Sequence, residues 1–211
     1  MPEFELTCFD KSGNSYKPAL MLELTGCDWQ PRLVDYFHGE TRGDAYREIN
    51  VMGEAPVLFH GDTVLSQSGV ILDYLAEVTG RFGPETPAER REIWRWILFD
   101  NHKLTSYTAT LRFMRSIGKT GETPVTEFLD KRARGAWDVL DRQLRTRDFV
   151  IGDRPTIADL SFAGYLFYED EIGIPFTDYP ALNAWRGRIR ALPGWKGPYE
   201  LMPAAPMPDT S

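Results

Sequence analysis

The segment from Gly53 to Glu77, GEAPVLFHGDTVLSQSGVILDYLAE, constrains the fold of this chain more than any other. Pro56 comes directly before the apolar run 57–59, and a proline that opens a strand removes one backbone donor from the sheet. Gly61-Asp62 separates this run from a second apolar run, as a tight hairpin requires. The segment therefore predicts a strand, a hairpin, a second strand and a helix, in that order.

The helix at the end of this segment is expected to open on Gln67-Ser68. This places an amide and a hydroxyl beside the free backbone N–H groups of a helix N-terminus. Such a group of donors suits a carboxylate. The same residues would also fit a hairpin and a helix cap in some other α/β domain, so the segment alone leaves both interpretations open.

Strand and helix signals alternate over the first 80 residues. We expect strands at 4–9 and 30–36 besides the hairpin, and helices at 15–25, 44–49 and 70–78. Gly26 is expected to close the first of these helices as a left-handed C-cap. This β-α-β-α-β-β-α order is typical of a thioredoxin-like domain.

The second half of the chain reads as helical. Thr86-Pro87-Ala88-Glu89 has the pattern of a capping box with proline at the first helical position. Further helices are expected from Thr123-Pro124 to about Arg145, and after a second capping box at Thr156–Asp159. Apolar positions with helical spacing support the helix that follows Thr86 and the helix that follows Thr123. They are Trp94, Ile97, Leu98, Leu104 and Leu111 in the former, and Phe128, Trp137, Leu140 and Leu144 in the latter.

The predicted fold class is thus α/β plus all-α. We expect a thioredoxin-like domain at 1–80, a linker at 81–86, a helical bundle domain at 87–203 and a loose tail at 204–211.

Composition excludes several classes of protein. The net charge of −7 argues against a nucleic-acid partner or an anionic membrane surface. We see no apolar run near the roughly 20 residues of a membrane span, and no secretory signal. Cys8 and Cys27 have no metal-ligand spacing, so we expect no metal site and two reduced thiols in a cytoplasmic protein.

The segment around Pro56 resembles the glutathione-binding part of the glutathione S-transferase family, and its Gln-Ser form is similar to the zeta class. Three later segments agree with the family in the same order: the turn and capping box at 152–159, Tyr179-Pro180-Ala181-Leu182, and Leu192-Pro193-Gly194-Trp195. The resemblance covers nearly the whole chain. It implies glutathione as co-substrate, with Pro56 in the cis form, Val57 pairing with the cysteinyl backbone, and Gln67 with Ser68 holding the γ-glutamyl end.

Chemistry on glutathione requires a thiolate, which a hydrogen-bond donor and a helix N-terminus can stabilise. In the zeta class a Ser-Ser-Cys-Ser run does this, and the matching run here is Ser12-Gly13-Asn14-Ser15. The resemblance favours Ser12 as the hydroxyl that stabilises the thiolate. Asn14 could also donate through its amide, and Ser15 could either touch the sulfur or cap the helix. Because Asn14 stands where the zeta class has cysteine, disulfide exchange and the isomerase activity typical of that class are disfavoured.

The remaining substrate contacts rest on weaker patterns. Arg42, in the loop 38–42, is a candidate partner for the glycine carboxylate. Glu54 stands where many family members carry an amide, and would either repel that carboxylate or pair with a basic neighbour. On the long helix, Tyr107, Thr108 and Arg112 are candidates for lining the electrophile pocket.

The function that we predict is a glutathione S-transferase that adds the thiolate to an electrophilic, mostly hydrophobic small molecule, as in detoxification. The alternatives are a glutathione-dependent isomerase, dehalogenase or peroxidase on the same site, or a non-enzymatic protein that binds glutathione or other ligands. The family resemblance also implies a homodimer.

Overall fold

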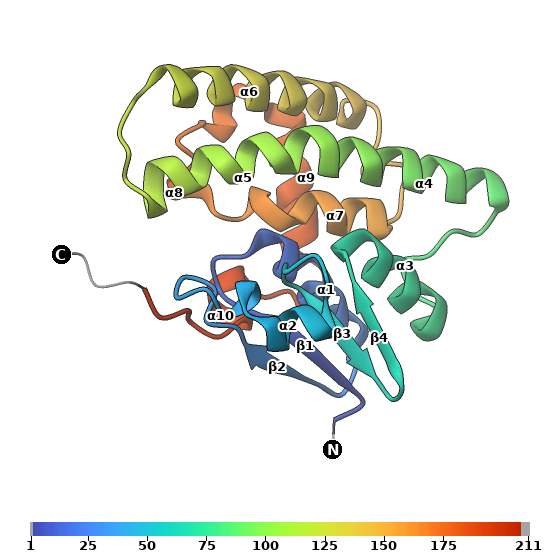
Figure 1. The fold of residues 1–211 in the computed structure, drawn as a ribbon. Helices are drawn as coiled ribbons and strands as arrows, with labels where there is room; N and C mark the ends of the chain where they lie inside the picture. Colours follow the sequence, from blue (N-terminus) through green and yellow to red (C-terminus); the bar gives the residue numbers. More distant parts are fainter. Residues whose placement is uncertain (1, 208–211) are drawn as a thin grey trace. The chain divides into compact units, whose positions relative to one another are not determined.

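The computed structural model describes residues 2–207, and the chain forms two compact units. Within the described residues, the first unit comprises 2–81 together with 193–207, and the second comprises 82–192. Figure 1 labels their helices and strands. The thioredoxin-like and helical parts of the predicted fold class are both confirmed.

The first unit is built on a four-stranded mixed sheet with the order β2-β1-β3-β4. Its strands are β1 (Phe4–Cys8), β2 (Trp29–Leu33), β3 (Val57–His60) and β4 (Thr63–Ser66). β1 runs parallel to β2 and antiparallel to β3, with Leu6 opposite Leu58, and β3 and β4 form the predicted hairpin. The helices of this unit are α1 (Gly13–Thr25), η1 (Glu40–Arg42), α2 (Asp44–Ile49), α3 (Ser68–Thr79) and α10 (Pro198–Leu201).

The two faces of this sheet follow from strand alternation, since successive side chains of a strand point to opposite faces. Val57 belongs to a buried cluster with Phe9, Val34 and Tyr46, so α2 covers that face. Helices α1 and α3 pack against each other, with α1 in contact with β1 and α3 in contact with β4. Gly26 ends α1 with a φ of 72°, which confirms the predicted left-handed cap.

The C-terminal segment differs from the predicted tail. The backbone N–H of Asp10 donates to the Pro203 carbonyl at 2.8 Å, and the Asp10 carboxylate accepts from the Ala205 N–H at 3.0 Å. Ala205 is buried in the first unit. Residues 204–207 are therefore held by the first unit rather than loose, while 208–211 lie outside the described residues.

The second unit is all-helical. Its elements are α4 (Pro87–Phe99), η2 (Asp100–Thr105), α5 (Ser106–Arg112), η3 (Phe113–Ile117), α6 (Pro124–Leu144), α7 (Ile157–Leu166), α8 (Glu169–Ile172), η4 (Phe176–Asp178) and α9 (Pro180–Arg190). The expected long helix continues through η2 and η3, which are π-helical segments. At the start of η2 the buried Asp100 carboxylate accepts from the hydroxyls of Thr105 and Ser161, at 2.9 Å and 2.6 Å. None of the helices in residues 2–207 is both long enough and apolar enough to cross a membrane.

The two capping boxes have different outcomes. At Thr156 the box is complete, because Asp159 accepts from the Thr156 N–H while the Thr156 hydroxyl accepts from the helix. At Thr86 the hydroxyl accepts from the Glu89 N–H as predicted, but the Glu89 carboxylate accepts from the Glu85 N–H and from Arg154 instead. The predicted bond from the Thr86 N–H to the Glu89 side chain is therefore wrong, since the Glu89 carboxylate bonds Glu85 and the distant Arg154.

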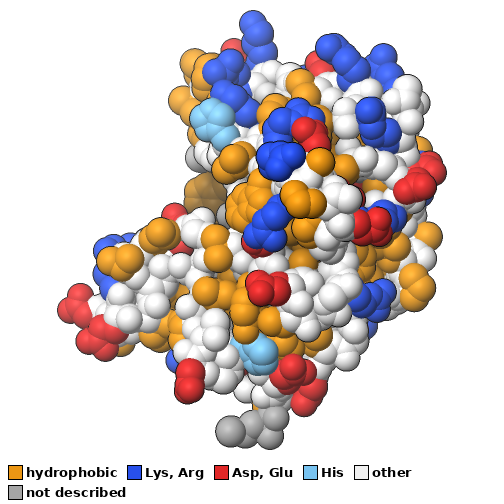
Figure 2. All heavy atoms as spheres, turned by 90° about the vertical axis from the view of Figure 1, so that its right-hand side faces the viewer, with side chains coloured by type: hydrophobic (Ala, Val, Ile, Leu, Met, Phe, Trp, Pro, Cys, Tyr) orange, Lys and Arg blue, Asp and Glu red, His pale blue; other side chains and the backbone are white. Residues whose placement is uncertain are grey.

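Two of the apolar positions whose spacing indicated these helices are exposed. Leu98 in α4 has 62% of its surface exposed and Phe128 in α6 has 55%. Figure 2 shows that hydrophobic side chains lie among Lys and Arg on the surface of this unit. Both residues nevertheless lie in the helices that their spacing predicted.

Candidate functional site

The start of α1 places the three candidate residues for the thiolate within one helical turn. Ser12 is the N-cap, and its Oγ accepts from the Ser15 N–H at 3.1 Å. The Ser15 hydroxyl also donates to Ser12 Oγ, at 3.0 Å. Ser15 is fully buried and Ser12 nearly so. Ser12 therefore caps the helix, and the alternative in which Ser15 is the cap is wrong.

This geometry leaves one hydrogen-bonding role for Ser12. A hydroxyl has two acceptor lone pairs and one proton, and both lone pairs of Ser12 Oγ are used by Ser15. The Ser12 O–H proton can still be donated, at the positive end of a 13-residue helix. Asn14 lies beside it, and among residues 2–207 its buried Oδ1 has no hydrogen-bond partner.

The Ala55–Pro56 peptide is cis, and Val57 follows it as the first residue of β3. Val57 is fully buried. Its N–H donates to Thr7 Oγ1 at 2.6 Å, and the Thr7 hydroxyl donates to the Val57 carbonyl at 3.3 Å. The Val57 backbone is thus bonded inside the protein. Its N–H is therefore not open for the contact with glutathione that we expected at this residue.

Ala55, on the other side of the cis peptide, is only half-buried. No hydrogen bond within the described part of the chain uses its backbone N–H or carbonyl. The neighbouring Glu54 carbonyl, by contrast, accepts from the Asn50 side chain at 2.7 Å and from the Tyr46 hydroxyl at 3.1 Å. Burial raises the pKa of Tyr46, so its phenol stays protonated and able to donate at neutral pH. These bonds fix the segment before Pro56 and leave Ala55 open.

Gln67 and Ser68 lie at the N-terminus of α3 as predicted. Gln67 has a φ of 70°, in the left-handed region that favours glycine, and Ser68 begins the helix in a buried position. The exposed Gln67 amide donates to Glu54 Oε2 at 3.0 Å and lies 2.9 Å from Met52 Sδ. A non-glycine residue with this backbone conformation costs roughly 1–3 kcal/mol and is typical of functional sites.

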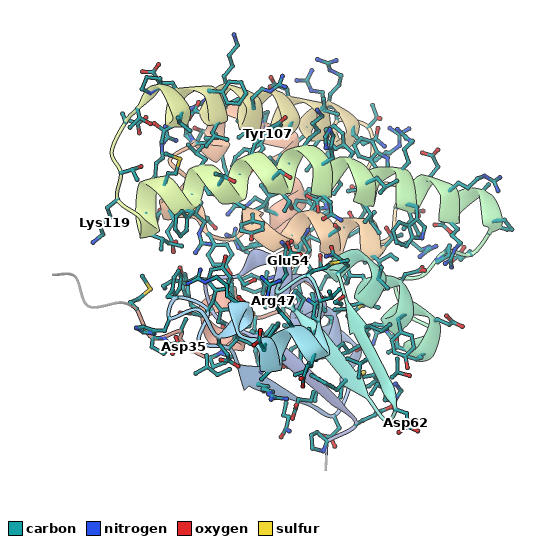
Figure 3. The ribbon with its side chains drawn as sticks, in the orientation of Figure 1. Asp35, Arg47, Glu54, Asp62, Tyr107 and Lys119 are labelled. Carbon is teal, nitrogen blue, oxygen red and sulfur yellow. The ribbon has the colours of Figure 1, made fainter. Side chains whose placement is uncertain are left out.

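Two arginines, one in η1 and one in α2, precede the segment of the cis-proline in the chain. The guanidinium of Arg42 lies back over Gly39 in its own loop, so that a Cβ at Gly39 would be 2.8 Å from Arg42 Nη2. Arg47 extends from α2 past Gly53, beside the segment that carries Glu54 (Figure 3). Arg47 donates through Nε to the Arg42 carbonyl at 3.3 Å. Sequence reasoning selected Arg42 and missed Arg47, because the bend of η1 that brings α2 to this loop has no sequence signal.

In the second unit, Tyr107 lines a pocket of about 250 Å³ between α4–α5 and α6 (Figure 3). Its ring lies below the cations of Lys103 and Arg132, at 6.0 Å and 5.4 Å from the ring centre. The other residues of this pocket are Phe99, Lys131, Gly135, Ala136 and Val139. The pocket thus combines an apolar floor with a positively charged rim.

The structure separates Thr108 and Arg112 from this pocket. Thr108 is fully buried, and its hydroxyl accepts from Trp137 Nε1 at 3.0 Å. Arg112 is 1% exposed, with its guanidinium 3.6 Å from the ring centre of Tyr168 and 2.8 Å from the Glu171 carboxylate. Both side chains take part in the packing of the helical unit.

The mixed sheet with a cis-proline before β3 and the all-helical second unit together have the architecture of the glutathione transferases. Models of the glutathione S-transferase N-terminal and C-terminal domains match residues 12–78 and 123–188. The chain therefore belongs to the glutathione S-transferase family, as a transferase with glutathione as its co-substrate.

Individual relatives agree with this assignment. Glutathione S-transferase F10 of Arabidopsis thaliana is 26% identical over 194 residues, which span 87% of this chain and 90% of the relative. The crystal structure of a glutathione S-transferase from Pseudomonas fluorescens is 31% identical, covers 94% of this chain and 100% of its own, and has a TM-score of 0.89. A glutathione transferase from Burkholderia graminis, solved with two glutathione molecules per subunit, is 22% identical, covers 92% of this chain and 85% of its own, and shares the fold with a TM-score of 0.81.

Proposed function

We propose that Ser12 stabilises the glutathione thiolate by donating its hydroxyl proton to the sulfur. The thiolate then attacks an electrophilic carbon of the second substrate, so that a carbon–sulfur bond forms and the leaving group departs with its electron pair. The N-terminus of α1 contributes its dipole to the same negative charge. Both effects lower the pKa of the thiol and raise the share of the nucleophilic thiolate at neutral pH.

The observation that carries this proposal is the state of the Ser12 hydroxyl. Its oxygen accepts two hydrogen bonds from Ser15, which leaves the proton as the group that can bind a ligand. Asn14 is the runner-up for the contact with sulfur. Its buried Oδ1 is an acceptor, which would serve an N–H of the peptide better than a thiolate.

For the rest of glutathione we propose separate contacts for its two carboxylate ends and for its cysteinyl backbone. Gln67 and Ser68 at the N-terminus of α3 bind the γ-glutamyl carboxylate. The cysteinyl backbone pairs with Ala55 rather than Val57. The backbone groups of Ala55 are open, whereas Thr7 already bonds those of Val57. Arg42 or Arg47 binds the glycine carboxylate.

For the electrophile we propose a hydrophobic compound, with Tyr107 lining its pocket. The aromatic and aliphatic floor beside Tyr107 supports a hydrophobic molecule, and Lys103 with Arg132 supports one that carries negative charge. Thr108 and Arg112 would act on this pocket only through the helix that they hold in place.

The experiment follows the fate of glutathione with an activated aryl halide. We expect halide and S-aryl glutathione to appear in equal amounts as thiol disappears. Release of halide with regeneration of free glutathione would contradict conjugation and support a dehalogenase, and glutathione disulfide formed with a peroxide would support a peroxidase. Gln67→Ala should weaken glutathione binding in calorimetry, whereas Glu77→Ala, an exposed change in the same helix, should leave it unchanged.

We further propose a cytoplasmic homodimer that acts in detoxification. The free thiols of Cys8 and Cys27 support a reducing compartment. The exposed Leu98 and Phe128 support an apolar contact with a second copy. Light scattering should give twice the monomer mass, and Leu98→Glu with Phe128→Glu should lower it. A monomeric mass for the unmodified protein would contradict the homodimer.

A further inference from the structure

The two serines at the start of α1 form an asymmetric pair. Ser15 donates twice to Ser12 Oγ, through its backbone N–H at 3.1 Å and its hydroxyl at 3.0 Å. An ordinary N-cap accepts only the backbone bond. The second, hydroxyl-to-hydroxyl bond is therefore an addition that capping alone does not require.

Burial shows where each hydroxyl can act. Ser15 is fully buried and Ser12 retains 7% of its surface exposed. The Ser15 proton is directed to Ser12 Oγ, so its hydroxyl has no proton left for a ligand. Of the two side chains, only Ser12 has both a free proton and some exposed surface.

We propose that Ser15 is a positioning residue that acts on glutathione through Ser12. Its hydroxyl occupies the second lone pair of Ser12 Oγ, which turns the Ser12 proton outward to the sulfur. A donor in such a chain is also polarised by the bond that it accepts, so Ser12 becomes a stronger donor to the thiolate. This inference rests on the proposed role of Ser12 and deepens it.

The inference distinguishes Ser15 from a second direct donor. If Ser15 acts only through Ser12, removing its hydroxyl has no effect once the Ser12 hydroxyl is gone. If it touches the sulfur itself, the effects of the two substitutions are independent. A double-mutant cycle separates the two cases, because it isolates the coupling between residues in contact.

The experiment measures the pH profile of kcat/KM for aryl halide conjugation in four proteins: unmodified, Ser12→Ala, Ser15→Ala and the double variant. We expect Ser15→Ala to raise the apparent thiol pKa and to lower kcat/KM below that pKa by about threefold, the size of one weak net hydrogen bond. KM for glutathione should stay the same. Ser15→Thr keeps the hydroxyl and should restore the profile.

Thermal unfolding of each variant shows whether the cap survives. An additive loss in the double variant would overturn the inference, because Ser15 would then act on the sulfur independently. A lower melting temperature with an unchanged pH profile would also overturn it, since Ser15 would then serve only the helix. If Ser12→Ala itself leaves the profile unchanged, the proposed function of Ser12 fails, and the role of Ser15 fails with it.

Discussion

The hydroxyl of Thr7 bonds both backbone groups of Val57, accepting from its N–H at 2.6 Å and donating to its carbonyl at 3.3 Å. The two residues are 50 positions apart, on β1 and at the start of β3. The same hydroxyl lies 3.3 Å from the phenol of Tyr46, which donates to the Glu54 carbonyl. One threonine therefore ties β1 to the segment on either side of Pro56.

Replacing Thr7 with valine should destabilise the first unit. Valine keeps the shape but leaves the buried Val57 N–H without an acceptor, which costs about 1–3 kcal/mol. Urea unfolding measures the loss, and Thr7→Ser, which keeps the hydroxyl, is the matched control. Equal stability of Thr7→Val and the unmodified protein would show that the bond is not needed.

Replacing Gln67 with glycine should separate stability from binding. Glycine adopts a φ of 70° without the cost that glutamine bears, so we expect the free energy of unfolding to rise by about 1 kcal/mol. Glutathione affinity should fall, because the amide is lost. Gln67→Ala removes the amide but keeps the Cβ, and should lose affinity without gaining stability. Full affinity in both variants would exclude Gln67 from the site.

The helix caps show which parts of the fold can be predicted from adjacent residues in the sequence. Gly26 and the Thr156–Asp159 box were predicted from adjacent residues and formed as expected. Ser12 and Ser15 are both hydroxyls near the start of one helix, so the sequence alone could not decide which of them caps it. The cap depends on the extended backbone of Ser12, with φ −93° and ψ 102°, which the residue types alone do not reveal.

The features that the sequence did not predict depend on distant residues. The bond from Thr7 that occupies Val57, and the bond from Asp10 that holds Ala205, each join segments far apart in the chain. Helical spacing likewise identified Leu98 and Phe128 as apolar positions, but spacing does not tell whether another element covers them. Pairing partners in tertiary structure have no periodic signature.

The two cysteines should differ sharply in reactivity. Burial raises the pKa of the Cys8 thiol from 9.0 to about 12, and Cys8 has no exposed surface, whereas Cys27 is half-buried. Only the thiolate reacts with alkylating agents. Iodoacetamide at pH 8 should therefore label Cys27 in the folded protein and Cys8 only after unfolding, as read by mass spectrometry. Labelling of both at equal rates would contradict the buried thiol.

Cys8 should also make stability fall at alkaline pH. Between pH 9 and about 12 its thiol is ionised in the unfolded chain but protonated in the folded protein. The unfolded state then binds fewer protons, so the free energy of unfolding decreases as pH rises, by about 1.4 kcal/mol per unit. Cys8→Ala removes this contribution, and its stability curve should be flatter than that of the unmodified protein in this range. Parallel curves would contradict the assignment.

Substitutions of the neighbours Tyr107 and Thr108 should change different properties, KM for Tyr107 and stability for Thr108. Tyr107→Ala removes an aromatic wall of the pocket, so KM for a hydrophobic electrophile should rise about tenfold, as expected for a loss of one to two kcal/mol of apolar contact. Thr108→Val removes the acceptor of the buried Trp137 N–H and should lower stability while leaving KM unchanged. A raised KM for Thr108→Val with an unchanged KM for Tyr107→Ala would show that Thr108, and not Tyr107, contacts the electrophile.

The central claim, that Ser12 stabilises the thiolate, is tested most directly by the ultraviolet titration of bound glutathione. The ordinary pKa of a thiol is about 8.5. We predict that glutathione bound to the unmodified protein ionises well below that value. Ser12→Ala should raise the thiol pKa toward the ordinary value while glutathione still binds, with the dipole of α1 accounting for any lowering that remains. A bound thiol that titrates at the same low pH in both proteins would contradict the account and assign the role to Asn14.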